Sequence, residues 1–181
     1  MKHAGQNMRQ LALKPQDVVT AVQLALGRAE TAMSFARLGE SLVMSASEAH
    51  AAVQRGVLCG LVAREFGELQ TNRSALMELL VHGIRHVFPP IFGPVARGVR
   101  TGAYVQALAE HFPKDDGALI VWPDPEGLDR GVSLCPLYPT VPVAARRDPR
   151  LHEALALVDA VRAGNARERE LAIGLLQEKF R

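Results

Sequence analysis

Residues 34–55 read SFARLGESLVMSASEAHAAVQR, and the middle of this stretch decides the fold. Ser45 and Glu48 form the pattern of a capping box, in which the serine hydroxyl accepts a hydrogen bond from the Glu48 amide. The Glu48 carboxylate can in turn accept one from the Ser45 amide. Such a box marks the first turn of a helix, so a helix is expected to begin directly after Ser45.

The residues after this box predict a short helix with two unlike faces. Ala49, Val53 and Val57 recur every four residues, which places them on one side of the helix and towards a core. Gly60 is expected to end the helix. The opposite side carries small and polar residues, a composition that permits close approach to a partner surface.

Two further helices are expected before this one. Pro15 at a first helical position, with Asp17 in the first turn, predicts a helix through about Gly27. Ser34 can cap a second helix that runs to about Val43. Its inward-facing residues are expected to be Phe35, Leu38 and Leu42.

A small hairpin and a fourth helix are expected next. Residues 61–71 predict a strand, a turn at Glu65-Phe66-Gly67-Glu68 and a second strand. The fourth helix, capped by Asn72 or Ser74, is expected to run to about Val87.

The central part of the chain predicts little regular structure. Residues 88–104, FPPIFGPVARGVRTGAY, are rich in proline and glycine and predict an extended loop. Ala118 to Trp122 predict one strand, and the three prolines of residues 136–142 predict another irregular stretch.

The end of the chain predicts two helices. Asp148 is a cap with proline at the first helical position after it, and Gly164 stops this helix. Residues 165–168 can cap the last helix. Both helices have apolar faces, which either pair with a second chain or cover the core of the same chain. The residues of these faces are Leu151, Leu155, Val158, Leu171, Leu175 and Phe180.

The stretch from Ser34 to Arg55 resembles a helix-turn-helix. Residues 60–62 with the hairpin resemble the winged-helix elaboration of MarR-like bacterial transcriptional regulators, and the resemblance covers about residues 12–75. In that motif Gly39 stands where two helices approach closely. Gly56 departs from the pattern, because glycine inside a helix costs roughly 1 kcal/mol relative to alanine. The expected core positions are Leu38, Leu42, Met44, Ala49, Val53 and Val57.

The fold class expected from these features is mainly α, with a small β wing. Residues 1–87 are expected to form a winged helix-turn-helix DNA-binding domain. Residues 88–147 are expected to connect it to a helical hairpin over residues 148–181 that serves packing or dimerisation. The downstream half has the general look of bacterial winged-helix proteins encoded beside abortive-infection nucleotidyltransferase toxins.

The resemblance implies that residues 45–57 form a recognition helix for the major groove of double-stranded DNA. Gln54 can pair with adenine, and His50 and Ser47 can donate or accept at base edges. The Glu48 carboxylate is shared between this role and the capping box, and exposed polar residues on a helix are also compatible with a solvated surface. The predicted base-reading residues are Ser47, Glu48, His50, Ala51 and Gln54.

The charge distribution favours a polyanionic partner for the first half of the chain. The net charge is only +2, but residues 1–100 hold 11 Lys and Arg against 7 Asp and Glu, whereas residues 101–181 hold 10 against 12. Phosphate contacts position a protein on DNA without specifying a sequence. The imbalance is also compatible with a solvated surface. The residues predicted to contact phosphate are Arg37, Ser45, Arg55, Arg64, Arg73, Arg97 and Arg100.

Other chemistry is not expected. The sequence has no glycine-rich phosphate loop after a strand and no nucleophile elbow, so neither an enzyme nor a cofactor is predicted. His82 and His86 lie four residues apart, but no metal site is predicted, because a third ligand and the glutamate of metalloproteases are missing. Cys59 is expected to be buried. Two cysteines make no disulfide framework and no apolar run could span a bilayer, so a cytoplasmic protein without a membrane partner is expected.

The sequence therefore predicts a transcriptional regulator, a repressor that binds double-stranded DNA as a homodimer, because two half-sites multiply a modest affinity. The alternative is a protein-interaction module, such as an antitoxin whose C-terminal half binds and neutralises a partner enzyme. A winged helix used only for protein contact belongs to this alternative.

Overall fold

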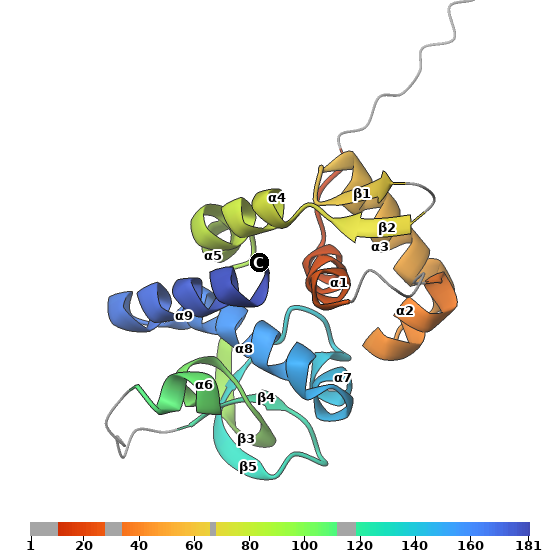
Figure 1. Ribbon diagram of the computed structural model, residues 1–181. Helices are drawn as coiled ribbons and strands as arrows, with labels where there is room; N and C mark the ends of the chain where they lie inside the picture. Colours follow the sequence, from red (N-terminus) through yellow and green to blue (C-terminus); the bar gives the residue numbers. More distant parts are fainter. Residues whose placement is uncertain (1–10, 28–33, 66–67, 112–118) are drawn as a thin grey trace, which may run out of the picture.

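The computed structural model describes residues 11–27, 34–65, 68–111 and 119–181. Within them the chain is mostly helical and carries two small sheets, a two-stranded hairpin and a closed three-stranded barrel. Figure 1 shows the hairpin and the first helices on one side of helix α8 (Pro149–Ala163), and the barrel on its other side.

The three N-terminal helices are α1 (Pro15–Leu26), α2 (Phe35–Leu42) and α3 (Ala46–Leu58), which confirms the three predicted elements. The hydroxyl of Ser45 accepts a hydrogen bond from the Glu48 amide at 3.1 Å. Glu48 Oε2 accepts one from the Ser45 amide at 3.3 Å. The predicted capping box is therefore formed, and it fixes the start of α3.

The turn between α2 and α3 depends on two residues. A Cβ atom added at Gly39 would lie 2.7 Å from the carbonyl oxygen of Met44, so the predicted small-residue position is confirmed. Val43 occupies the turn with φ 55° and ψ 45°. This left-handed conformation is uncommon for a β-branched residue, so the turn carries backbone strain.

The buried face of α3 differs from the predicted one. Val57 is 36% exposed and Cys59 is exposed, so their expected burial was wrong. Gly56 takes the core position instead, because a Cβ at this residue would lie only 3.0 Å from Val62 Cγ2. The glycine that departs from the motif thus lets the hairpin approach α3 closely. The buried residues of α3 are Ala49, Ala52, Val53 and Gly56.

The hairpin consists of the antiparallel strands β1 (Val62–Glu65) and β2 (Glu68–Thr71), as predicted. Thr71 Oγ1 donates a hydrogen bond to the carbonyl oxygen of Ala21 in α1 at 2.8 Å. The hairpin is therefore fixed to the first helix as well as to α3.

The predicted fourth helix is confirmed over residues 73–87 as one continuous helical segment with a π-helical centre. Asn72 caps it, because its side chain accepts a hydrogen bond from the Ala75 amide at 3.1 Å. The parts of the segment are α4 (Arg73–Glu78), the π-helix (Leu79–Gly83) and α5 (Ile84–Val87).

The extended loop predicted over residues 88–104 was wrong. This stretch contains β3 (Phe92–Arg100), the strand that pairs with both other strands of the barrel. Pro94 and Gly98 lie at positions of β3 where proline and glycine are compatible with strand pairing. Pro94 lies where the register shifts between Phe92 and Val95, so its missing N–H leaves no gap in a regular ladder. A Cβ at Gly98 would overlap the Trp122 carbonyl group, so the close strand pairing requires glycine.

The other strands of the barrel are β4 (Ile120–Pro123), which confirms the strand predicted there, and β5 (Asp129–Leu134), which the sequence pattern did not indicate. Ala118 lies outside the described residues. A short 3₁₀ turn (Gly102–Tyr104) and α6 (Gln106–Ala109) follow β3.

The C-terminal helices are α7 (Val141–Arg147), α8 and α9 (Ala166–Lys179). Asp148 caps α8 by accepting from the Arg150 amide at 2.9 Å, and Asn165 caps α9 by accepting from the Glu168 amide at 3.0 Å. Both predicted caps are confirmed. The apolar face of α8 covers the core of its own chain, because Leu151, Leu155 and Val158 are at most 1% exposed.

A buried polar network joins α8 to the barrel. The Asp159 carboxylate accepts hydrogen bonds from Thr101 Oγ1 at 2.9 Å and from Trp122 Nε1 at 2.6 Å, and it also pairs with Arg162. On the other side of α8, apolar contacts continue into α1, and one connected hydrophobic core runs through both halves. The division into three parts stays a prediction.

Candidate nucleic-acid interface

The polar face of α3 is open to solvent. Ser47, His50 and Gln54 are exposed, and Ala51 between them is half-buried. Gln54 Nε2 lies 3.4 Å from His50 Nε2, so the two polar side chains form one patch. The helix therefore holds its apolar side against α1, α2 and the hairpin and leaves a small polar side free to meet a partner.

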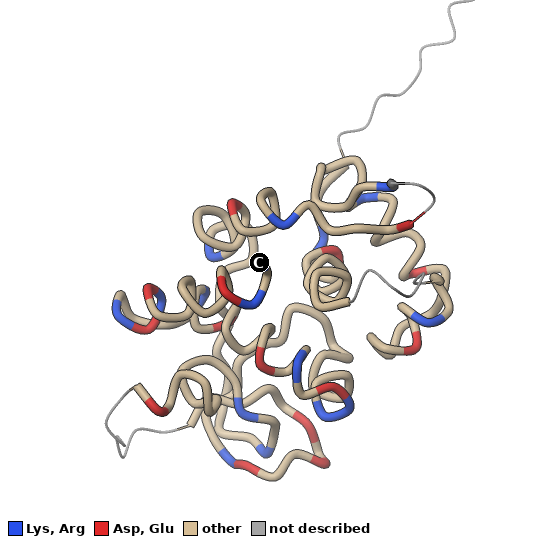
Figure 2. The backbone as a smooth tube through the Cα atoms, viewed as in Figure 1, with Lys and Arg blue, Asp and Glu red and all other residues tan. Residues whose placement is uncertain are grey.

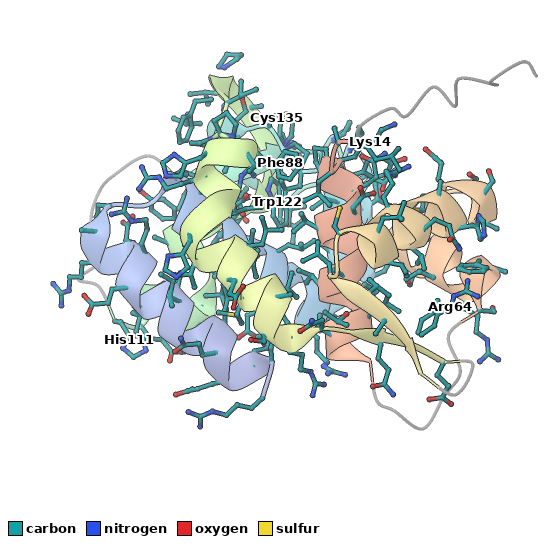
Figure 3. All side chains as sticks on the ribbon, turned by 90° about the horizontal axis from the view of Figure 1, so that it is seen from above. Lys14, Arg64, Phe88, His111, Trp122 and Cys135 are labelled. Atoms are coloured by element: carbon teal, nitrogen blue, oxygen red, sulfur yellow. The ribbon has the colours of Figure 1, made fainter. Side chains whose placement is uncertain are left out.

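The imidazole of His50 is positioned by an aromatic residue of α2. Its ring packs edge to face on Phe35, with the ring centroids 4.8 Å apart. The guanidinium of Arg64, from β1, lies 5.8 Å from the centroid of the same phenyl ring. Phe35 thus connects α2, α3 and the hairpin at this end of the molecule, where Figure 3 labels Arg64. The sequence predicted Phe35 as an inward-facing residue, and its half-buried position between His50 and Arg64 was missed.

Glu48 is engaged within the chain. Its Oε1 accepts a hydrogen bond from the Tyr138 hydroxyl at 2.8 Å, and its Oε2 accepts from the hydroxyl of Ser45 at 3.1 Å. The Tyr138 hydroxyl and then the Ser45 groups lower the pKa of the Glu48 carboxyl below its ordinary value of 4.5. The ionised carboxylate therefore caps and anchors α3, and we leave Glu48 out of the candidate base-reading face.

A second hydrogen bond joins the chain segment that contains Tyr138 to the turn before α3. Thr140 Oγ1 donates a hydrogen bond to the carbonyl oxygen of Leu42 at 2.7 Å. Tyr138 and Thr140 belong to the segment between β5 and α7, 90 or more positions away from their partners. No local sequence signal indicated this connection.

Arg55 does not extend towards a partner. Its Nε lies 2.8 Å from Asp17 Oδ2 and its Nη2 lies 2.7 Å from Asp17 Oδ1, and the Asp17 side chain is fully buried. The hydrogen bonds that Arg55 donates to the Asp17 carboxylate raise the pKa of the Arg55 guanidinium. This bidentate pair ties α3 to α1, so the predicted phosphate contact of Arg55 conflicts with its position.

Arg97 and Arg100 also lie away from the polar face of α3. Both belong to β3, on the barrel side of α8 in Figure 1. Arg100 Nη2 pairs with Asp129 Oδ1 at 2.6 Å, which raises the pKa of the guanidinium. The predicted set of phosphate-contacting residues is therefore spread over two sides of the molecule.

The remaining predicted phosphate contacts lie nearer to α3. Arg37 on α2, Ser45 at the start of α3, Arg64 on β1 and Arg73 on α4 are all exposed. Arg73 Nη2 donates to the Ala25 carbonyl oxygen at 3.4 Å. Figure 2 shows acidic residues interspersed with the basic ones along the chain in that view.

No protein-family model, curated protein or solved structure matches this chain. Among the described residues, no helix combines the length and apolar character needed to cross a bilayer. The described part of the chain also contains no group of three or more His, Cys, Asp or Glu side chains placed to hold a metal ion.

Proposed function

We propose that the protein is a transcriptional regulator, a repressor that binds specific sites in double-stranded DNA. In this proposal α1, α2, α3 and the hairpin act as a winged helix-turn-helix, and α3 enters the major groove. The three helices followed by an antiparallel hairpin have the element order of that motif, and the close approach at Gly39 is the packing it requires.

One observation carries the proposal: the exposed polar face of α3. Ser47, His50 and Gln54 are exposed on a helix whose opposite side is held in the core by Ala52 and Val53. A recognition helix needs such a division, because its back must be fixed by supporting helices while its front meets base edges.

The roles of the side chains follow from their chemistry. The Gln54 amide has both a donor and an acceptor and suits adenine, and Ser47 and His50 can donate or accept at base edges. Arg64, which lies over the same Phe35 ring that His50 packs against, and Arg37 on α2 are exposed cations and suit phosphate oxygens. Packing against Phe35 restricts both His50 and Arg64, which reduces the entropy lost on binding.

Binding to DNA is tested first by fluorescence anisotropy. Genomic fragments that copurify with the protein supply the cognate site, and a random duplex of equal length is the comparison. Association with both is expected to weaken steeply as salt rises, because cations on the protein displace counterions from the phosphates. Failure to associate with either duplex at low salt would refute the proposal.

Base reading is tested with substitutions on α3. His50→Ala and Gln54→Ala are each expected to lower the preference for the cognate over the random site by about 1–3 kcal/mol. Gln177→Ala is the matched control, since Gln177 is an exposed glutamine on α9. Arg64→Ala is expected to weaken both duplexes alike. Equal losses on both duplexes for Gln54→Ala would contradict its assignment as a base reader.

A two-fold operator calls for a dimer, and the position of its interface is constrained. Leu151, Leu155 and Val158 are buried within one chain, so α8 has no apolar face left for a second copy. We expect the homodimer to use another surface, and analytical ultracentrifugation with and without the cognate duplex measures its stoichiometry.

The second candidate function is a protein-interaction module, such as an antitoxin that binds a partner enzyme. Its support is that five large apolar side chains between the end of α5 and the start of β5 are exposed, whereas soluble proteins rarely expose large apolar patches. A protein of this kind would show weak DNA binding with no preference for a genomic site. The residues concerned are Val87, Ile91, Phe92, Val95 and Leu128.

A further inference from the structure

A cavity of about 560 Å³, open to solvent, lies beside the start of α1 and the barrel. It is bounded by the start of α1, by the segment that joins α5 to β3 and by the segment that joins β5 to α7. Phe88 and Cys135, which both line it, lie close together in Figure 3. Its volume lies within the roughly 300–1,000 Å³ that small-molecule sites occupy.

The lining defines the chemistry of a ligand. The walls are formed by five prolines and by large apolar side chains, among them Phe88, Ile91 and Leu137. Proline has a fixed φ, so these walls need little ordering when a ligand enters. The described lining contains one charged residue, Arg162, and no carboxylate. An apolar molecule without a positive charge suits this composition.

Arg162 supplies a polar group at this cavity. Its side chain is 4% exposed and donates to Asp159, to the Phe88 carbonyl oxygen at 2.9 Å and to the Pro89 carbonyl oxygen at 3.3 Å. These three bonds use three of the five N–H donors that a guanidinium carries. A hydrogen-bond acceptor on a ligand, neutral or anionic, could therefore pair with Arg162.

The wall formed by residues 135–139 also holds the candidate recognition helix. Within this segment Tyr138 donates to Glu48 in the first turn of α3, and Thr140, directly after the segment, donates to the Leu42 carbonyl oxygen. Pro136, Leu137 and Pro139 line the cavity. One short segment thus has the cavity on one side and the start of α3 on the other.

We propose that this cavity binds a small apolar molecule carrying a hydrogen-bond acceptor, and that its occupation regulates DNA binding through the segment 135–140. A bound molecule packs against the Pro136–Pro139 wall and draws this stiff segment towards the cavity, away from α3. This movement loosens the Tyr138–Glu48 hydrogen bond, so α3 loses part of its support. The proposal that the cavity binds a ligand depends on the cavity alone. The proposal that this binding regulates DNA binding rests on the proposed function.

Ligand binding is tested with 8-anilinonaphthalene-1-sulfonate, a fluorescent aromatic anion. We expect saturable binding that Ile91→Trp weakens by about tenfold, because an indole at this position fills part of a site of this size. Ile91 is 63% exposed, so the substitution adds bulk without disturbing the core. Leu128→Trp is the matched control, since Leu128 is 96% exposed and does not line the cavity.

The controls distinguish dye binding in the cavity from non-specific dye binding to the protein surface. Thermal unfolding checks that both tryptophan variants are as stable as the parent. N-phenyl-1-naphthylamine has the same rings without the sulfonate and is expected to bind more weakly, because it gives Arg162 no anionic acceptor. Equal dye affinity for the Ile91→Trp and Leu128→Trp variants, or binding without saturation, would overturn the proposed site.

Regulation is tested by measuring the affinity for the duplex in the presence of the dye, and the affinity for the dye in the presence of the duplex. Saturating dye is expected to lower the affinity for the cognate duplex by about fivefold or more, and saturating duplex to lower the dye affinity by the same factor. Tyr138→Phe removes the hydroxyl that bonds Glu48. It is expected to keep the dye affinity, since Tyr138 does not line the cavity, but to reduce the coupling. Dye binding in the cavity with unchanged duplex affinity would refute the coupling.

One readout does not depend on DNA at all. Hydrogen exchange of the amides in the first turn of α3 is expected to speed up when the dye binds, and Tyr138→Phe is expected to show the faster exchange without dye. If no duplex is bound but this change occurs, the proposed function fails and the connection between cavity and α3 stands. Unchanged exchange in the presence of bound dye would refute that connection.

Discussion

The Asp17–Arg55 pair allows a sharp test of how α3 is held. Arg55→Met keeps the aliphatic volume and removes the guanidinium. Among the described residues, the fully buried Asp17 carboxylate then keeps the Lys14 amide, 2.8 Å away, as its one hydrogen-bond donor. Removing one partner of a buried pair costs about 3–5 kcal/mol. Because the Arg55 side chain is 15% exposed, we expect a loss near the lower end, about 3 kcal/mol.

The assay is urea unfolding followed by circular dichroism at pH 7, together with a thermal scan. For a chain of this size a loss of about 3 kcal/mol lowers Tm by roughly 6–12 °C. In the double variant Asp17→Asn, Arg55→Met the buried charge is absent, so the total loss is expected to be smaller than the sum of the two single losses. A change below about 0.5 kcal/mol for Arg55→Met, accompanied by weaker duplex binding, would refute this reasoning and return Arg55 to the phosphate contacts.

Three further predictions concern other contacts. Gly39→Ala is expected to destabilise the protein by about 1–3 kcal/mol in urea unfolding, because its Cβ would lie 2.7 Å from the Met44 carbonyl oxygen. Gly174→Ala is its control and is expected to stabilise by about 0.5–1 kcal/mol, since nothing lies within 4 Å of that Cβ in α9. Asp159→Ala is expected to cost about 3–5 kcal/mol, because Arg162 would stay buried without its carboxylate; a loss below 1 kcal/mol would contradict this. The lowered pKa of Glu48 means that its contribution to stability is present above the ordinary value of 4.5 and is lost as the pH falls through the folded-state pKa. Acid titration followed by NMR should show the first turn of α3 loosening in that range, and Glu48→Gln should remove this pH dependence.

Some residues of the candidate site could be placed from local sequence, and others could be placed only from their contacts in the folded chain. The exposure of Ser47, His50 and Gln54 follows from the capping box and from helical periodicity, both of which involve residues a few positions apart. The assignment of Arg55 and Glu48 required knowledge of their partners. Asp17 lies 38 positions before Arg55, and Tyr138 lies 90 positions after Glu48. Only the folded chain brings these groups together.

The strands give a second example. The stretch around Pro94 reads as a loop because proline and glycine usually interrupt regular structure. It forms β3 because Pro94 falls at a break in the ladder and Gly98 meets the Trp122 carbonyl group, and both facts depend on where β4 and β5 lie. A strand is stabilised by its neighbours, so its own residues describe it incompletely.

The sequence by itself determined the helices over residues 15–58, 73–87 and 149–179, their caps and the polar face of α3, because helix formation and capping are governed by interactions within one or two turns. It did not predict the short helices α6 and α7. The tertiary structure decided which charged side chains pair within the molecule and which glycine lets the hairpin approach α3. It also decided that a proline-rich segment both lines a cavity and supports the start of that helix. These outcomes depend on contacts between residues far apart in the chain. Burial then converts such contacts into large energies, because an unpaired polar group away from water is costly.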